Sequence, residues 1–276
     1  MSSLTINTNI DAINAYNNLN TTDQSLSTAV GRLSSGLQVQ TAADNASGYV
    51  ISQYLTEESN GLGQAVTNGQ DAVAVLQTAS GAMNQITSIL QRMNELATQA
   101  ANGGATFNSA QTADNTEFQD LAKQITQIAD STQFGNTQLL DGTYTGTFQL
   151  GAYNSTNDQV AVSISKLDAT TLGVTGTVGV DSTASAQAAM SIVQNAIAYV
   201  ATVEGTVGAS QNQIQALVAN ITVGQQNLQA ANSQIVDVNM AQEMTSYSAD
   251  QILMQAGTAM LAQAQQNPGL VLKLLQ

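Results

Sequence analysis

The longest pattern in the chain is an apolar ladder in its second half, which climbs in alternating steps of four and three residues. Steps of this size keep every rung on one side of a helix, as in a coiled-coil seam. Its rungs, of which only Ser210 and Gly224 lack an apolar side chain, are Ala189, Val193, Ala196, Val200, Val203, Val207, Ser210, Ile214, Leu217, Ile221, Gly224, Leu228, Ala231, Ile235 and Val238. The ladder predicts a long helix over about residues 184–266, with one break near 230 and a stop at Pro268.

A second ladder lies much earlier in the sequence and fails only at Gly69. Its rungs are Ala65, Gly69, Ala72, Leu76, Ala79, Met83, Ile86, Leu90, Met93, Ala97 and Ala100. It predicts a helix over about residues 54–101, which the first ladder would cover as a long antiparallel rod. The flanks of both ladders carry Ala, Asn, Gln, Ser and Thr rather than Lys and Glu, which suits packing between subunits better than free solvation.

Two shorter helices are predicted beside this rod. The first covers about residues 12–37, and Gly36 can end it because glycine adopts the left-handed conformation easily. Its rungs are Ala12, Tyr16, Leu19, Asp23, Leu26, Val30, Leu33 and Leu37. A linker over 38–48 follows, and another helix over about 114–132 carries Phe118 and Ile125 on one face.

The apolar period changes from helical spacing to two after residue 132. Residues 147–150 and 160–164 alternate in polarity around a stretch of turn formers, so a β-hairpin is expected. Residues 173–185 read either as a second short hairpin or as a surface loop. The predicted fold is mainly α: a long antiparallel helical rod, or coiled coil, with a small β-hairpin region at about 140–183.

Composition removes several classes of function. The chain has no Cys and no His, which takes away the usual metal ligands, thiol nucleophiles and general base, so neither catalysis nor a cofactor is expected. Five basic against 19 acidic residues give a net charge of −14, which disfavours nucleic acid and anionic membranes. No basic residue precedes Arg32 and no apolar run approaches the length of a membrane span. We expect neither a cleaved Sec signal peptide nor membrane insertion.

Ordered motifs at both ends carry a family resemblance. The N-terminal motifs are Ile6-Asn7-Thr8-Asn9-Ile10, Arg32-Leu33-Ser34-Ser35-Gly36-Leu37 and Ala42-Ala43-Asp44-Asn45-Ala46-Ser47-Gly48. The C-terminal motifs are Ile235-Val236-Asp237-Val238-Asn239-Met240-Ala241, Gln251-Ile252-Leu253-Met254-Gln255-Ala256-Gly257 and Val271-Leu272-Lys273-Leu274-Leu275. With them the chain resembles bacterial flagellin, in a short form that inserts almost no outer domain after Thr171-Leu172-Gly173.

The resemblance implies a structural protein that is secreted and polymerises into the flagellar filament used for motility. Residues 1–42 and 233–276 would form the two halves of an inner-tube domain, and 43–232 a rod domain. Implied partners are further flagellin subunits and the export chaperone, junction and cap proteins. One alternative is a hook–filament junction protein, which has the same arrangement of N- and C-terminal segments. An alternative of another class is a soluble ligand of a flagellin-sensing innate immune receptor.

The resemblance also implies two groups of site residues. Contacts in assembly are expected at Leu19, Leu26, Leu33, Leu37, Asp44, Ile252, Leu253, Leu272, Leu274 and Leu275. The segment around Arg92 and Leu96, with Glu117, looks like the part of flagellin that the flagellin-sensing Toll-like receptor of animals recognises. Arg92 and Glu95 alone would also fit an ordinary surface ion pair at helical spacing.

Overall fold

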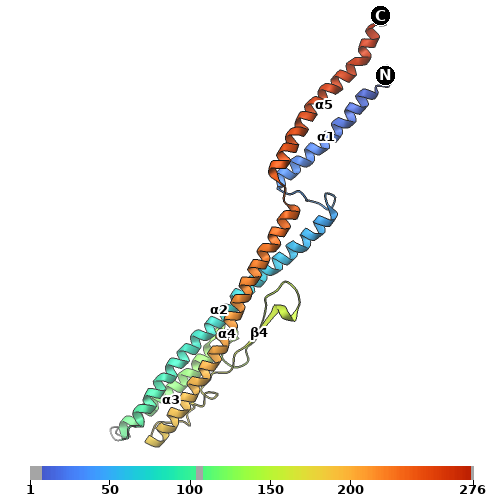
Figure 1. Cartoon of the computed structure of the whole chain (residues 1–276). Helices are drawn as coiled ribbons and strands as arrows, with labels where there is room; N and C mark the ends of the chain where they lie inside the picture. The colour runs from blue at the N-terminus through green and yellow to red at the C-terminus, as the bar shows by residue number, and fades with distance from the viewer. Residues whose placement is uncertain (1–7, 104–107, 275–276) are drawn as a thin grey trace. The chain divides into compact units, whose positions relative to one another are not determined.

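The computed structural model describes residues 8–103 and 108–274, and it is mainly helical (Figure 1). The helices are α1 (Ile10–Ser35), α2 (Ala46–Ala100), α3 (Asn108–Ser131), α4 (Thr183–Val236) and α5 (Met240–Leu274). The chain forms two compact units. One contains Met1–Glu57 and Asn227–Gln276, and the other contains Glu58–Gln226, so the division falls inside α2 and α4.

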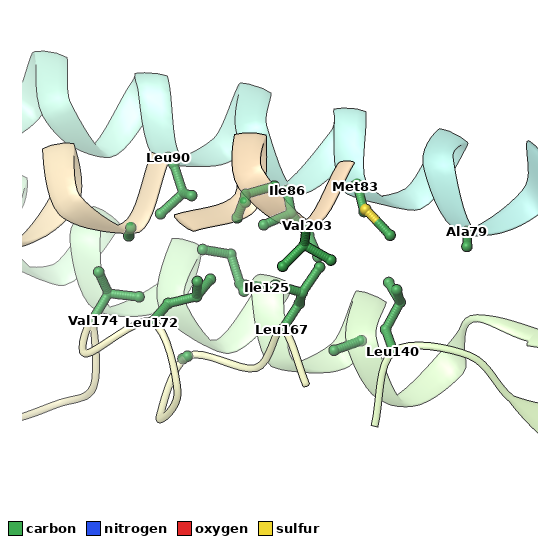
Figure 2. Close-up of a cluster of buried hydrophobic side chains, with 14 of the residues drawn as sticks. Ala79, Met83, Ile86, Leu90, Ile125, Leu140, Leu167, Leu172, Val174 and Val203 are labelled. Atoms are coloured by element: carbon green, nitrogen blue, oxygen red, sulfur yellow. The ribbon is translucent and has the colours of Figure 1, made fainter. Parts of the chain in front are cut away.

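The unit of residues 58–226, called the rod below, contains the α2 ladder and most of the α4 ladder. All rungs of the ladder on α2 are buried, and those of the α4 ladder are buried from Ala189 to Val207 and again at Ile214. Phe118 and Ile125 on α3 complete the core with no exposed surface. Figure 2 shows Met83, Ile86 and Leu90 on α2 pointing toward Ile125 and Val203 on the facing helices. The alternating steps of four and three residues therefore identified the seam correctly.

The one failure of the α2 ladder, Gly69, is a point of close contact. A Cβ atom at Gly69 would lie 2.3 Å from Cγ2 of Val218 and 3.3 Å from Cδ2 of Leu150. The β-branched Val218 cannot turn away easily, because its side chain has few rotamers in a helix. Glycine is required here because the seam is already filled by side chains of α4 and of the hairpin region.

We expect Gly69→Ala to lower the free energy of unfolding of the rod by about 1–3 kcal/mol, because the added methyl overpacks the seam. The matched control is Gly81→Ala in the same helix, where a new Cβ meets nothing within 4 Å. That variant should gain stability by roughly 0.5–1 kcal/mol from helix propensity. Urea unfolding followed by circular dichroism measures both. If Gly69→Ala raises the free energy of unfolding, Val218 and Leu150 can move away from the new methyl group and the seam is not overpacked.

The β region packs on the rod as two small antiparallel sheets. Strands β3 (Thr145–Gln149) and β4 (Gln159–Ser163) form the predicted hairpin, with the 3₁₀ helix η1 (Thr156–Asp158) in its loop. A smaller hairpin of β1 (Gln133–Phe134) and β2 (Thr137–Gln138) was not predicted. Residues 173–182 form turns, so the surface loop, and not a second hairpin, is the correct one of the two alternatives. Side chains from the connections, including Leu140, Leu167 and Val174, point into the core in Figure 2.

The second unit pairs α1 with α5, side by side in Figure 1. The predicted α1 ladder is partly wrong. Tyr16 and Val30 are 56% and 47% exposed, and Asp23 is exposed too. The inner positions are instead Ala12, Ala15, Leu19, Thr22, Leu26, Ala29 and Leu33. Small residues replace the larger ones because α5 approaches closely: Cδ1 of Leu19 lies 3.2 Å from where a Cβ of Gly257 would stand.

The break between α4 and α5 lies at residues 237–239, later than predicted, and it is paired with the connection after α1. Leu37 and Asp237 form an isolated antiparallel bridge. The N–H groups of Gln38 and Val39 donate to the carbonyl of Val236, at 2.6 and 3.3 Å, and Val238 N–H donates to the carbonyl of Gly36 at 3.0 Å. Gly36 ends α1 with a φ of 76°, as its sequence position indicated.

The predicted stop at Pro268 is wrong, since α5 continues to Leu274. A proline inside a helix removes the hydrogen bond to the carbonyl four residues earlier, here that of Ala264. This carbonyl instead accepts a hydrogen bond of 2.7 Å from Nδ2 of Asn9. The same Asn9 side chain caps α1, because its Oδ1 accepts from the N–H of Ala12 at 3.0 Å. The side-chain amide of Asn9 thus forms hydrogen bonds with backbone groups of both α1 and α5.

Asn9→Asp should separate these two roles. Aspartate remains a good helix cap, but it has no N–H to donate, so the carbonyl of Ala264 loses its partner at a cost of about 1–3 kcal/mol. We expect faster amide hydrogen exchange in α1 and α5. Pro268→Ala supplies the missing backbone N–H, so it should restore much of the protection in the double variant. Equal exchange in the double and single variants would contradict this account.

Candidate assembly interface

Large apolar side chains that remain exposed gather along α1 and α5. On α1 they are Ile10, Ile13, Tyr16 and Val30, and on α5 they are Met240, Met244, Ile252, Leu253 and Met260. Ile252 is 67% exposed and Leu253 is 55% exposed. Solvated helices usually place polar residues on such faces. These edges therefore offer apolar area to a neighbouring molecule.

The predicted assembly residues divide into two groups. Leu19, Leu26, Leu33 and Leu37 are half-buried, the first three at the contact between α1 and α5, whereas Ile252 and Leu253 face outward. Leu272 and Leu274 fall in the last turns of α5, and Leu275 lies outside the described residues. Sequence reasoning missed the outward-facing Ile10, Ile13, Met240, Met244 and Met260, and it placed Tyr16 and Val30 on the inner face.

An open groove of about 520 Å³ runs between α1 and α5. It is lined by Asp11, Asn14, Ala15, Asn18, Leu19 and Thr22 on one side, and by Leu253, Ala256, Gly257, Met260, Gln263 and Ala264 on the other. Most of its bordering residues are small or apolar, and they bear a single charge, that of Asp11. Such a lining suits an apolar side chain of a partner better than a charged ligand.

Asp44 stabilises a loop within its own chain. Its Oδ2 accepts hydrogen bonds from the N–H of Gln40 at 3.2 Å, the N–H of Thr41 at 2.9 Å and the hydroxyl of Thr41 at 3.0 Å. The two bonds from Thr41 lower the pKa of the Asp44 carboxyl, with a smaller effect from Gln40. The geometry thus gives Asp44 a role in shaping the connection between α1 and α2.

The receptor candidates lie on the rod, and the structure brings two of the three together. Nη2 of Arg92 lies 2.9 Å from Oε1 of Glu117, across from α2 to α3, and Nη1 lies 3.1 Å from Oε2 of Glu95. Hydrogen bonds to these carboxylates, first to Glu117, raise the pKa of Arg92. Leu96 is only 1% exposed and belongs to the core, so it does not share the surface with Arg92.

Comparisons with known proteins agree at the level of family. Residues 6–145 match a family model described as the bacterial flagellin N-terminal helical region, and residues 190–275 match the bacterial flagellin C-terminal helical region. The chain is similar to flagellin of Halalkalibacterium halodurans, with 38% identity over 273 residues that cover 98% of this chain and 99% of the relative. Flagellin of Bacillus subtilis is 35% identical over 310 residues, which cover 98% of this chain and 99% of that protein.

Among solved structures, a putative flagellar hook-associated protein from Vibrio parahaemolyticus has a similar fold. The TM-score is 0.58 at 12% sequence identity, and the match covers 70% of this chain and 100% of that one. At this identity the likeness concerns the fold alone. No helix in the described ranges is long and apolar enough to cross a membrane.

Proposed function

This chain belongs to the bacterial flagellin family, and we propose that its subunits contact one another through the exposed apolar edges of α1 and α5. The protein is a structural subunit of the extracellular flagellar filament and is not an enzyme. The comparisons favour neither the junction protein nor a dedicated signalling ligand. A filament grows when one surface of a subunit binds a different surface of the next and the rotation between subunits does not close a ring.

The observation that supports the proposed edges is the contrast in burial between the two units. Of the described side chains on α1 and α5, only Ala29 and Ala264 are buried, whereas the rod holds a continuous apolar core. Covering an exposed Ile, Leu or Met side chain contributes about 1.5–3 kcal/mol. We propose that α1 and α5 are marginally stable in the free subunit and become fully ordered when neighbouring subunits cover them.

Electron microscopy and brief proteolysis together test the proposal. Purified protein should form filaments under precipitant. A protease should trim the free subunit up to about residue 43 and back to about residue 233, which the predicted domain boundaries imply, and it should leave the ends intact in filaments. Equal resistance of the ends in both forms would contradict order gained on assembly. Failure to form filaments at all would contradict polymerisation through these edges.

Export and accessory partners follow from membership of the family and belong to this proposal. We propose that the subunit leaves the cell without a cleaved Sec signal peptide, as membership of the flagellin family implies. An export chaperone would cover the apolar edge of α5 before assembly, and junction and cap proteins would meet the ends of the filament. Mass spectrometry of secreted subunits that retain an unprocessed N-terminus would support the export route.

An animal innate immune receptor is a further candidate partner. The supporting observation is the exposed ion pair: the side chains of Arg92 and Glu117 are 48% and 46% exposed, although Glu117 lies on another helix. Arginine with its planar five-donor fork is a common interface anchor. The proposed patch therefore contains Arg92 and Glu117 without Leu96.

Arg92→Ala should weaken receptor binding by about 2 kcal/mol or more, as truncation of an anchor does. The melting temperature should change little, because exposed ion pairs contribute about 0–1 kcal/mol. Lys123→Ala removes another surface ion pair of α3, with Asp120, and serves as the control. A receptor-cell assay with soluble subunits measures the effect. If Arg92→Ala signals like the parent protein, this partner is excluded at the patch.

A further inference from the structure

Side chains that two-electron oxidants attack readily are distributed unevenly in this molecule. The chain has no Cys, no Trp and no His, so its eight Met residues are the main targets of peroxide. Met83 and Met93 lie in the rod core with no exposed surface. Met240, Met244 and Met260, all on α5, are 48%, 49% and 65% exposed. The strongly exposed methionines of the described residues thus lie on one helix, whereas Met190 on α4 and Met254 on α5 are partly buried.

These methionines lie on the surface proposed for assembly. Met240 and Met244 are four residues apart, so they share one side of α5. Met260 borders the groove between α1 and α5, where Leu253 and Leu19 also lie. Each thioether is therefore open to small oxidants and adjoins apolar area that a neighbouring subunit would cover.

We propose that Met240, Met244 and Met260 form an oxidation site that controls polymerisation, which rests on the proposed assembly through α5. The reagent is a peroxide-class oxidant. The thioether sulfur gains one oxygen and becomes a sulfoxide, while the O–O bond of hydrogen peroxide breaks and the peroxide is reduced to water. Reduction of the sulfoxide by a thiol-dependent reductase would return the thioether and water, while two thiols of that enzyme are oxidised to a disulfide.

The consequence for assembly follows from polarity. A sulfoxide carries a strongly polar S–O group, which must lose its water when a neighbouring subunit covers it. Oxidation therefore weakens the contact between subunits, while the buried Met83 and Met93 stay shielded in the rod core. Assembled subunits should be protected, since the contact covers the same sulfur atoms.

The first test measures oxidation residue by residue. The free full-length protein is treated with hydrogen peroxide at neutral pH, and sulfoxide at each methionine is followed by peptide mass spectrometry. Met240, Met244 and Met260 should react at least about tenfold faster than Met83 and Met93, because susceptibility follows exposure. In preformed filaments the same three rates should fall at least about tenfold. Unchanged rates in filaments would place these residues away from the contact and overturn the proposal.

The second test measures polymerisation after oxidation. The critical concentration should rise at least about tenfold for the oxidised parent. The triple variant Met240→Leu, Met244→Leu and Met260→Leu keeps similar apolar volume without sulfur, so peroxide should not change its critical concentration. The control Met83→Leu and Met93→Leu retains the exposed methionines and should remain sensitive.

Different results would contradict the oxidation site and the proposed assembly surface. Normal polymerisation of the triply oxidised parent, or equal sensitivity of the triple Leu variant, overturns the oxidation site. If the untreated parent forms no filaments, the assembly surface itself fails. Met260→Gln, which introduces a polar group without an oxidant, should raise the critical concentration while the melting temperature of the rod stays constant.

Discussion

Val200→Asp should abolish the stable rod. Val200 lies on the α4 seam with no exposed surface, so an aspartate there would bury a carboxylate among apolar side chains. The expected loss is about 4 kcal/mol or more, a large part of the stability of an ordinary domain. Thermal unfolding followed by circular dichroism measures it.

The matched control is Thr202→Asp, two residues along the same helix. Thr202 is exposed, and Thr and Asp have similar helix propensities, so this change should alter stability by less than about 1 kcal/mol. Similar melting temperatures for the two variants would mean that Val200 does not face the core.

The double variant Ile252→Asp and Leu253→Asp should lose filament growth and keep the rod intact. Both side chains are more than half exposed, Leu253 at the groove between α1 and α5, and each should contribute about 1.5–3 kcal/mol when a neighbouring subunit covers it. Their loss corresponds to at least about a hundredfold rise in critical concentration. Sedimentation of polymer at several protein concentrations gives that value.

A charge-matched control distinguishes lost apolar area from added repulsion. Gln255→Asp with Gln265→Asp places the same two negative charges on exposed positions of α5. This variant should polymerise with a critical concentration near that of the parent at physiological salt, where exposed charges are screened. If both double variants fail alike, net charge rather than the apolar edge limits assembly.

The rod could be predicted from sequence because its seam is long and regular. A repeat of four and three residues admits only one buried side when almost every rung is apolar, as from Ala72 to Ala100. In α1 the same spacing fits two neighbouring registers. The larger side chains of Tyr16 and Val30 favoured the wrong register, and the close approach of α5 selects Ala15 and Ala29 instead.

Two kinds of contact left no readable signal in the sequence. Leu140, Leu167 and Val174 lie in loops, where no period marks a buried side chain, yet they complete the rod core. The role of Asn9 depends on Ala264 at the other end of the chain, so only the paired helices bring the two groups together. For the proposed assembly edge, sequence motifs indicated Ile252 and Leu253, and the methionines were added because the structure exposes them.

The bridge between Leu37 and Asp237 has a consequence for the order of folding events. Joining two points so distant in an unfolded chain carries a large loop-closure entropy, which grows with the logarithm of loop length. Nδ2 of Asn232 donates a hydrogen bond of 3.2 Å to the hydroxyl of Thr56. Once this bond has formed, the loop that the bridge must close contains only residues 38–55 and 233–236. A chain that pairs α2 with α4 first therefore brings its two ends together at low entropic cost. We expect α2 and α4 to pair early, which is the step with the larger closure cost, and α1 to pair with α5 last.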